Sequence, residues 1–234
     1  MPYTTVLFDV GETLVRVPDP ARIYRDLLAT CGCSLSLPEV ESLLREVRDT
    51  VDQQIPRWVS DDLTLDCEAS VRRRALHVQT LLDGVGLGGC EDARATFFDL
   101  YVGPDFFSLY PDAMPTLEVL KARGYRLGIV SNWESRLLQL CAAHGIADHF
   151  DFAVVSELEG YVKPHPHMYR RALELAGAPP EQVIHVGDSL KDDIEGAATV
   201  GIRGVLVDRS ECGHTAYEPR ISSLLELEGV LDAA

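Results

Sequence analysis

The stretch Val6-Leu7-Phe8-Asp9-Val10-Gly11-Glu12-Thr13-Leu14 places an aspartate directly after a short apolar run. Short apolar runs rich in β-branched residues are typical of strands that are buried on both faces of a parallel sheet. In an open α/β sheet, ligands bind beyond the carboxyl ends of the strands. The stretch therefore predicts a first strand that ends at a candidate nucleophile or metal ligand, Asp9. The alternative is an ordinary turn or cap aspartate.

Similar apolar runs recur in the second half of the chain, at residues 127–130, 152–155, 183–186 and 204–207. Helical patterns lie between or before them, at residues 113–123, 134–144, 167–176 and 192–200, and each is followed by a glycine. Glycine after the last helical turn is a common helix stop signal. This alternation of strands and helices predicts a doubly wound α/β fold with a parallel sheet.

A long connection separates the first predicted strand from the second. It contains helical patterns at residues 20–30, 37–51 and 70–82. Loops of this length without structure of their own are uncommon in compact domains. We therefore expect an inserted helical domain over residues 17–107, and a core domain formed by residues 1–16 and 108–234.

The bulk composition is that of an ordinary globular protein, with 234 residues, 46% of them hydrophobic and 25% charged. The formal net charge of −16 repels nucleic acid and anionic lipid, so neither is an expected partner. No apolar run reaches the roughly 18 residues that a membrane span needs. The N-terminus shows no signal-peptide pattern. Together with six cysteines that form no paired CxxC spacing, these features predict a cytoplasmic protein with reduced thiols, a zinc site being the alternative.

Two further segments at strand ends carry candidate phosphate-binding groups. Ser131 and Asn132 follow the second strand and precede a helix, where a hydroxyl and helix N-terminal N–H groups form a phosphate site. Helix capping is the alternative for both residues. Lys163, before Pro164, lies in the loop after the third strand and is one of only three lysines. The alternative interpretation of Lys163 is a loop lysine that is exposed to solvent.

Gly187-Asp188 ends the fourth strand, and Asp192 and Asp193 follow shortly after. A strand-end aspartate with another carboxylate nearby suits a hard cation such as Mg²⁺. The alternative is that the later acids complement a helix dipole.

The order and strand-end placement of these pieces resemble the four motifs of the haloacid dehalogenase-like superfamily. That family reads Asp-x-Asp-x-Thr, then Ser or Thr, then Lys-Pro, then Gly-Asp with a later Asp. The resemblance covers residues 3–14 and 111–231. It implies a Rossmann-like core with strand order 3-2-1-4-5, and it identifies the insertion as a helical cap of the subfamily whose cap follows the first motif.

The resemblance also implies roles at the reacting centre. Asp9 attacks the phosphoryl group of a small phosphorylated metabolite and forms an aspartyl-phosphate. Asp9 and Asp188 bind Mg²⁺, with the backbone carbonyl of Gly11 as a further ligand. Ser131 and the N–H of Asn132 hold the transferring oxygens.

The remaining matched positions take supporting roles by the same resemblance. Lys163 offsets the negative charge of Asp9 and the phosphoryl group. Asp193 fits the later acidic position and fixes Lys163 or a metal-bound water, and Asp192 is its rival for that role. Thr13 supports the turn after Asp9.

The sequence departs from the family at the second aspartate of the first motif, which is Gly11 here. In phosphatases of this type that residue is the general acid, whose loss costs about 10²–10⁴-fold in rate. We expect acyl and aryl phosphates to react better than alkyl phosphates. Glu12, where the family usually has glycine, is either a tolerated turn residue or a substitute acid.

Other functions fit these motifs less well than a phosphatase does. Phosphonatases need a cap lysine, and residues 15–114 contain none. Haloacid dehalogenases do not keep the Gly-Asp pair, which is intact here, so a haloacid-type dehalogenase is the less favoured alternative. A phosphate- or metabolite-binding module without turnover is the main rival, and Gly11 favours it.

Several aromatic and basic residues remain ambiguous in the sequence alone. Trp133 either shapes the entrance or packs under the cap, and residues 72–74 form a run of arginines that is a solvated face or a contact for an anionic substrate. His165 and His167 are a metal pair or lie at a helix N-terminus. His185 is predicted to be a satisfied core residue.

Overall fold

The computed structural model describes residues 3–16, 19–55, 59–100, 106–209 and 216–233, with side chains of 98–100 excepted. The chain packs into two compact units. Unit 1 consists of Met1–Arg16, Asp61–Thr64 and Leu109–Ala234, and unit 2 of Val17–Ser60 and Leu65–Ser108. Asp61–Thr64 are thus part of unit 1, and Ser108 is part of unit 2. The division into a core domain and a cap domain over residues 17–107 stays a prediction.

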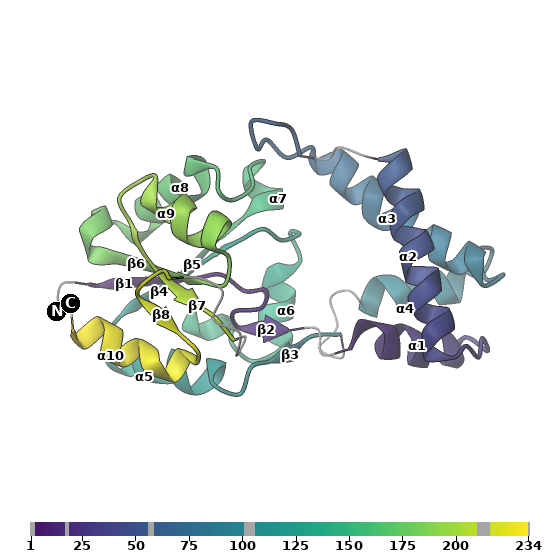
Figure 1. Ribbon diagram of the computed structural model, residues 1–234, viewed down its shortest axis with the longest axis horizontal. Helices are drawn as coiled ribbons and strands as arrows, with labels where there is room; N and C mark the ends of the chain where they lie inside the picture. The colour runs from purple at the N-terminus through teal and green to yellow at the C-terminus, as the bar shows by residue number, and fades with distance from the viewer. Residues whose placement is uncertain (1–2, 17–18, 56–58, 101–105, 210–215, 234) are drawn as a thin grey trace. The chain divides into compact units, whose positions relative to one another are not determined.

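A six-stranded parallel sheet forms the centre of unit 1 (Figure 1). Its order is β5-β4-β1-β6-β7-β8. The strands are β1 (Thr5–Phe8), β4 (Arg126–Ser131), β5 (Phe152–Val155), β6 (Val183–Gly187), β7 (Arg203–Val207) and β8 (Arg220–Ile221). The first five have the predicted order, so the doubly wound α/β prediction is confirmed. The sixth, β8, is only two residues long and gives no apolar run for a sequence pattern to detect.

The register of β1 explains how distant segments meet. Phe8, the last residue of β1, pairs with Ile129 of β4 on one side and with Val186 of β6 on the other. The peptide N–H of Asp9 then donates to the carbonyl of Val186 at 2.9 Å. The residues that follow these three strands therefore emerge at one edge of the sheet.

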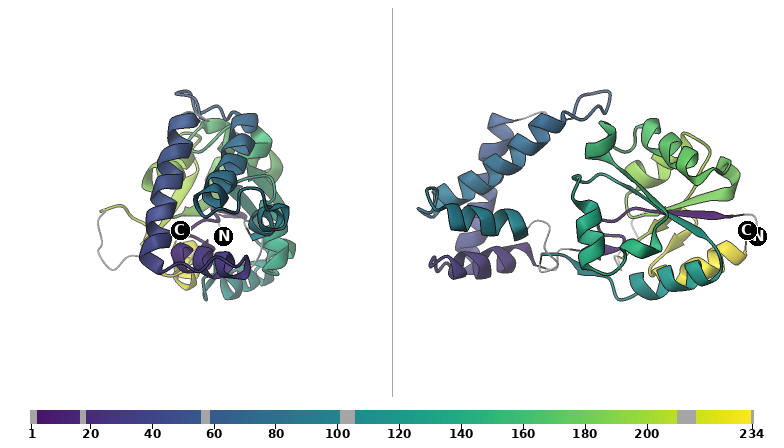
Figure 2. Two further views of the ribbon diagram at one scale, coloured as in Figure 1. Left: turned by 90° about the vertical axis from the view of Figure 1, so that its right-hand side faces the viewer. Right: turned by 180° about the vertical axis from the view of Figure 1, so that it is seen from behind.

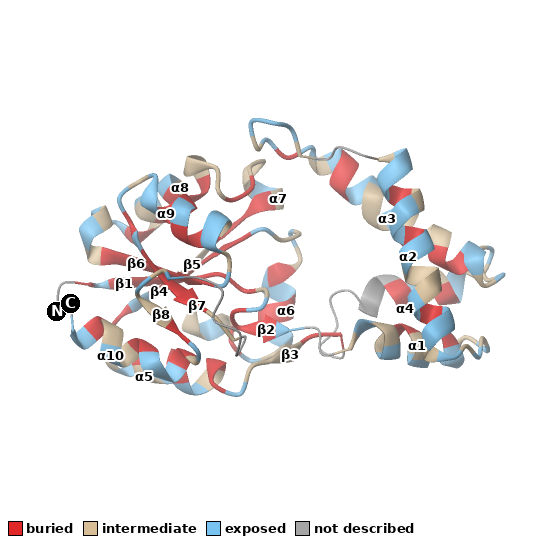
Figure 3. Ribbon diagram, viewed as in Figure 1, coloured by how far each residue is buried: buried red, intermediate tan, exposed pale blue. Residues whose placement is uncertain are grey.

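Both faces of the sheet are covered, which accounts for the nearly continuous burial of its strands (Figure 3). Helices α8 (Pro166–Ala176) and α9 (Gly196–Ala198) lie on one face, and α5 (Ala113–Ala122) and α10 (Leu227–Asp232) on the other (Figures 1 and 2). The shorter helices α6 (Leu137–Ala143) and α7 (Ser156–Glu159) follow β4 and β5. Each large apolar side chain buried in these layers contributes about 1.5–3 kcal/mol.

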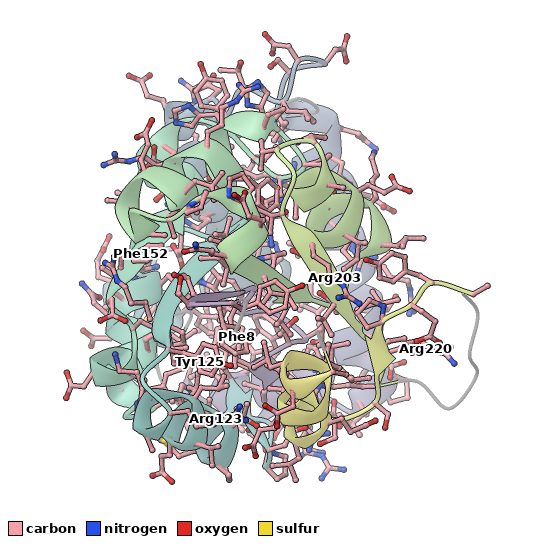
Figure 4. All side chains as sticks on the ribbon, turned by 90° about the vertical axis from the view of Figure 1, so that its left-hand side faces the viewer. Phe8, Arg123, Tyr125, Phe152, Arg203 and Arg220 are labelled. Atoms are coloured by element: carbon pink, nitrogen blue, oxygen red, sulfur yellow. The ribbon has the colours of Figure 1, made fainter. Side chains whose placement is uncertain are left out.

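Charged contacts fasten the C-terminal helix to its neighbour. Arg123, which is labelled in Figure 4, lies directly after α5. It contacts Glu228 at 3.2 Å and Asp232 at 2.5 Å, both from α10. Such exposed pairs contribute little to stability, because water and salt screen the charges. They add to the apolar contact that holds α10 in place.

The helix predicted at residues 192–200 is the one core element that differs in kind. Leu190–Glu195 (η3) form a π-helical turn, which passes into the short helix α9. Ser189 caps this turn, since its hydroxyl accepts the N–H of Asp192 at 3.1 Å. π-Helical turns are rare and frequent at functional sites. This turn carries both Asp192 and Asp193.

Unit 2 is helical. It contains α1 (Pro20–Thr30), α2 (Leu37–Gln54), α3 (Cys67–Gly84) and α4 (Glu91–Leu100). Asp19 and Asp66 cap α1 and α3 by accepting backbone N–H groups at 3.0 and 2.8 Å. Tyr24 stacks on Phe97 at 6.1 Å in the core of this unit. The fourth helix was not predicted, because its sequence has no clear apolar stripe.

Two short strands, β2 (Val15–Arg16) and β3 (Ser108–Leu109), form a separate two-stranded sheet. In the part of the chain that the structure describes, the five cysteines are free thiols. No helix within that part is both long and apolar enough to cross a membrane.

Candidate active site

Asp9 lies at the centre of the candidate site and is 6% exposed. Its Oδ1 accepts two hydrogen bonds, from the Ser131 hydroxyl at 3.0 Å and from the Lys163 ammonium at 2.6 Å. Within the described residues its second oxygen, Oδ2, accepts none. One oxygen is thus held in place while the other stays available to a reacting group or a cation.

Lys163 is 4% exposed and contacts Asp9 and Asp193 with its ammonium, each at 2.6 Å. Burial alone would lower the pKa of Lys163, but the two carboxylates raise it well above its usual range. Lys163 is therefore a permanent cation. Its backbone is held by the Asn132 side chain, which accepts the Lys163 N–H at 2.7 Å and donates to its carbonyl at 3.1 Å. The sequence predicted only the backbone N–H of Asn132 as a functional group.

Asp193 is 1% exposed and accepts three donors. Its Oδ1 accepts from Lys163 and from His185 Nε2 at 2.9 Å, and its Oδ2 accepts the N–H of Ser189 at 3.0 Å. Although burial would raise the pKa of Asp193, the Lys163 ammonium and the His185 hydrogen bond hold it well below its usual range. A Cβ on Gly187 would overlap the Asp193 carboxyl group, so glycine at position 187 makes room for this arrangement.

Asp192 and Asp193 were the two candidates for the later acidic position of the fourth motif, and the structure shows different contacts for each. Asp193 reaches Lys163, whereas the Asp192 side chain makes no hydrogen bond within the described residues. The Asp192 carbonyl instead accepts from the Tyr169 hydroxyl at 2.5 Å.

Asp188, which follows β6, completes a cluster of carboxylates. Oxygens of Asp9, Asp188 and Asp193 lie within 4.8 Å of one another. Asp188 is exposed, yet the protein around its carboxyl and the charges of Asp9 and Asp193 raise its pKa to about 7. Hard oxygen donors and uncompensated negative charge are the features that Mg²⁺ requires. The cluster therefore has the donors to hold a divalent cation. Asp9, Asp188 and the Gly11 carbonyl as its ligands stay a prediction.

Gly11 lies against Trp133. A Cβ on Gly11 would be 3.2 Å from Cζ3 of the indole, which is closer than ordinary van der Waals contact. Trp133 is itself anchored to Ser156, whose hydroxyl accepts the Trp133 N–H and donates to its carbonyl, both at 3.0 Å. The space that a side chain at position 11 would enter is partly filled by the indole.

Glu12 is one of two non-glycine residues with a positive φ in the described chain, at 52°. Its Oε2 accepts the hydroxyl of Tyr110 at 2.8 Å. Burial and the Glu12 carboxylate raise the pKa of Tyr110 to about 12, so the phenol remains a donor. One oxygen of the Glu12 carboxylate is thus occupied by the hydrogen bond from Tyr110. Whether it acts as a substitute acid stays a question for kinetics.

Thr13 is fully buried, and its role is in its backbone. Its carbonyl accepts from Arg209 at 2.8 Å, while its hydroxyl has no partner within the described residues. Arg209 also forms two hydrogen bonds with Asp112, at 2.9 and 3.0 Å. Asp112 in turn accepts the Ser223 hydroxyl and the Leu224 N–H. This network, the Arg209–Asp112 network, supports the turn after Asp9.

Comparison with known proteins agrees with this arrangement of strand-end motifs. A family profile described as haloacid dehalogenase-like hydrolase matches residues 3–201. The chain belongs to this family. It is therefore an enzyme of the hydrolase class.

Three relatives of this haloacid dehalogenase-like hydrolase indicate the range of related proteins. A glyceraldehyde 3-phosphate phosphatase from Methanopyrus kandleri is 37% identical over 92% of this chain and 87% of its own length. The crystal structure of a HAD phosphatase from Thermococcus onnurineus has a TM-score of 0.64 and 26% identity, and covers 97% of both chains. A 2-haloacid dehalogenase from Pseudomonas syringae pv. Tomato DC3000 has a TM-score of 0.70 and 25% identity over 99% of both chains.

Sequence patterns missed part of the site of this hydrolase. His185 was expected to be a satisfied core residue, but only its Nε2 has a partner, and Nδ1 is buried without one in the described structure. The feature of the sequence that could have indicated a role for His185 is its position in a strand that ends in Gly187-Asp188.

The other ambiguous histidines and the arginines lie in contacts of their own. His165 and His167 both stack on Tyr161, with ring centroids 4.4 Å away in each case. The arginines at 72–74 have partners inside unit 2.

Proposed function

We propose that this hydrolase is a phosphatase of small phosphorylated metabolites that acts through an aspartyl-phosphate on Asp9. The observation that carries the proposal is the buried Lys163 ammonium, 2.6 Å from an Asp9 carboxylate whose second oxygen has no hydrogen-bonding partner among the described residues. A nucleophilic oxygen next to a fixed cation is suited to attack on a phosphoryl group. The name of the Methanopyrus kandleri relative supports the same class of substrate.

The chain's own residues account for most of the chemistry. In the first step Asp9 attacks phosphorus, the bond from phosphorus to the leaving oxygen breaks, and that oxygen keeps the electron pair. Lys163 and Ser131 orient Asp9 and stabilise the negative charge of the transferring oxygens. In the second step water attacks the aspartyl-phosphate, which releases phosphate and restores the Asp9 carboxylate.

A divalent cation belongs to this proposal. Asp9, Asp188 and the Gly11 carbonyl would hold Mg²⁺, which supplies positive charge that offsets the charge of the phosphoryl oxygens. We also propose that the helical unit over residues 17–107 is the cap that selects the substrate, and that the protein acts in the cytoplasm.

Gly11 defines the preferred substrates within this class. A glycine offers no proton to the leaving oxygen, so leaving groups that are stable as anions should depart most readily. Acyl and aryl phosphates have such leaving groups, and alkyl phosphates do not. We therefore propose that this enzyme favours acyl and aryl phosphates by about 10²–10⁴-fold, the usual contribution of a general acid.

Initial rates on acetyl phosphate, p-nitrophenyl phosphate and glycerol phosphate test this proposal. Activity should depend on MgCl₂, disappear with EDTA, and be absent in Asp9→Asn, which keeps the shape of the side chain. Equal rates on all three substrates would contradict the account of Gly11. Activity that survives in Asp9→Asn would contradict the proposed nucleophile.

Gly11 also supports a second candidate function, a phosphate- or metabolite-binding module without turnover. Its distinguishing result is measurable binding of glycerol phosphate by calorimetry with no hydrolysis of any ester. A haloacid-type dehalogenase is a third candidate, in view of the Pseudomonas syringae relative. Release of halide from 2-chloropropionate in the presence of EDTA would favour it.

A further inference from the structure

His185 is connected to the nucleophile through a continuous series of buried polar contacts. His185 Nε2 lies 2.9 Å from Asp193 Oδ1, and the same oxygen accepts the Lys163 ammonium at 2.6 Å. Lys163 then contacts Asp9 at 2.6 Å. The series runs from the middle of β6 to the end of β1, and every member of it is buried.

The proton on the His185 ring can be assigned from its partner. The Asp193 carboxylate only accepts hydrogen bonds, because Lys163 and the N–H of Ser189 keep it ionised. Nε2 of His185 must therefore carry the proton of their shared hydrogen bond. Nδ1 has no partner in the described structure, although it is buried.

This unpartnered nitrogen makes His185 a costly choice for a core position. A buried polar atom without a hydrogen bond destabilises a protein by about 1–3 kcal/mol. A leucine of similar volume would avoid that cost. A polar residue that is unfavourable for packing indicates that its one hydrogen bond, to Asp193, has another function.

The surroundings leave the ring little freedom. Tyr169 packs its ring against His185 edge to face, with centroids 5.3 Å apart. The hydroxyl of the same Tyr169 donates to the Asp192 carbonyl, which fixes the backbone that carries Asp193. Ring and carboxylate are thus held by one neighbour, in the orientation that lets them bond.

We propose that His185 is a positioning residue, which fixes the Asp193 carboxylate and through it the Lys163 ammonium against Asp9. His185 itself stays two residues away from the reacting atoms. Without its hydrogen bond, Oδ1 of Asp193 keeps Lys163 as its sole donor, and the pair is free to shift relative to Asp9. Loss of such an outer partner typically reduces activity by about 10–100-fold.

Three substitutions separate positioning from simple packing. The amide of His185→Gln reaches approximately as far as Nε2 and can donate to Asp193. The amide of His185→Asn reaches only as far as Nδ1, and His185→Leu fills the space without a donor. The Gln and Asn variants are the matched pair, because both bury an amide and differ in reach.

Kinetics with p-nitrophenyl phosphate and MgCl₂, together with thermal unfolding midpoints, are the measurements. We expect kcat to fall about 10–100-fold in the Asn and Leu variants and to be largely retained in the Gln variant, with KM changing little. A Leu variant with the parent kcat would overturn the proposal. So would a Gln variant as slow as the Asn variant at a similar unfolding midpoint.

The inference rests on the proposed phosphatase activity, but a second measurement separates the two. Nitrogen-15 NMR of the parent protein reports which ring nitrogen of His185 carries a proton, whether or not any ester is hydrolysed. A parent protein without phosphatase activity refutes the proposed function alone. A spectrum in which Nε2 is unprotonated refutes the positioning role, and one with protonated Nε2 supports it.

Discussion

Replacing Gly11 with aspartate tests the account of the site most directly. Gly11 does not have a positive φ, so the backbone accepts a side chain at this position. A Cβ there lies 3.2 Å from Cζ3 of Trp133, and the indole must move by a few tenths of an ångström. Crowding of this kind costs about 1–3 kcal/mol. A general acid contributes about 10²–10⁴-fold, or roughly 3–5 kcal/mol at 1.36 kcal/mol for each tenfold.

For substrates whose leaving group must be protonated, the typical contribution of a general acid is therefore larger than the typical cost of crowding against Trp133. We expect Gly11→Asp to raise kcat/KM for glycerol phosphate by roughly 10–100-fold, because the middles of these two energy ranges differ by about 2 kcal/mol. The value for p-nitrophenyl phosphate should change little, because its leaving group needs little protonation. Adding Trp133→Leu removes the crowding and should increase the gain for glycerol phosphate further.

Gly11→Asn is the matched control, because it has the shape of aspartate and no acidic proton. The assay is initial rates on both esters at saturating MgCl₂, for the parent and all variants. The reasoning is refuted if Gly11→Asn raises glycerol phosphate hydrolysis as much as Gly11→Asp. It is equally refuted if the double variant shows no selective gain.

Three further perturbations have expected outcomes. Lys163→Met should lower kcat by about 10²–10³-fold, as loss of one charge-stabilising group does, while calorimetry shows Mg²⁺ binding at least as tight, since the site becomes more negative. The pKa of Asp112 is lowered from 3.8, because hydrogen bonds from Arg209 and its neighbours outweigh burial. Its stabilising effect is therefore present above pH 3.8 and lost as pH falls through the lowered value, so Asp112→Asn should flatten the decline of the urea midpoint below pH 3.8. Glu12→Gly should be more stable to urea than Glu12→Ala by about 1 kcal/mol. Both variants lose the Tyr110 hydrogen bond, and only alanine keeps the strain of a positive φ. Equal urea midpoints for the two variants would contradict this.

The sequence predicted the sheet well because five of its strands are buried on both faces and appear as apolar runs. The order of those strands, and the meeting of Asp9 with Lys163 and Asp188, came from the family resemblance. The short strand β8 and the helix α4 escaped prediction, because neither has a strong periodic pattern. The π-helical turn escaped too, since its acids look like an ordinary helix start.

The remaining features that the sequence did not predict are the directions in which side chains point. Contacts such as Trp133 with Gly11, or Asn132 with the backbone of Lys163, join segments that are far apart in the sequence. No residue pattern within one segment encodes which way such a side chain turns. The bond from His185 to Asp193 is similar, because it depends on a π-helical turn that no pattern indicated.

The Arg209–Asp112 network connects the C-terminal segment of the chain to the turn after Asp9. Asp112 accepts hydrogen bonds from Ser223 and Leu224, and its partner Arg209 holds the Thr13 carbonyl four residues beyond the nucleophile. A protein shortened before Ser223 would lose these two hydrogen bonds together with the buried side chains of Leu224, Leu227 and Leu231. Trimming the tail should therefore destabilise the core and loosen the turn after Asp9, although none of the removed residues lies in the candidate site.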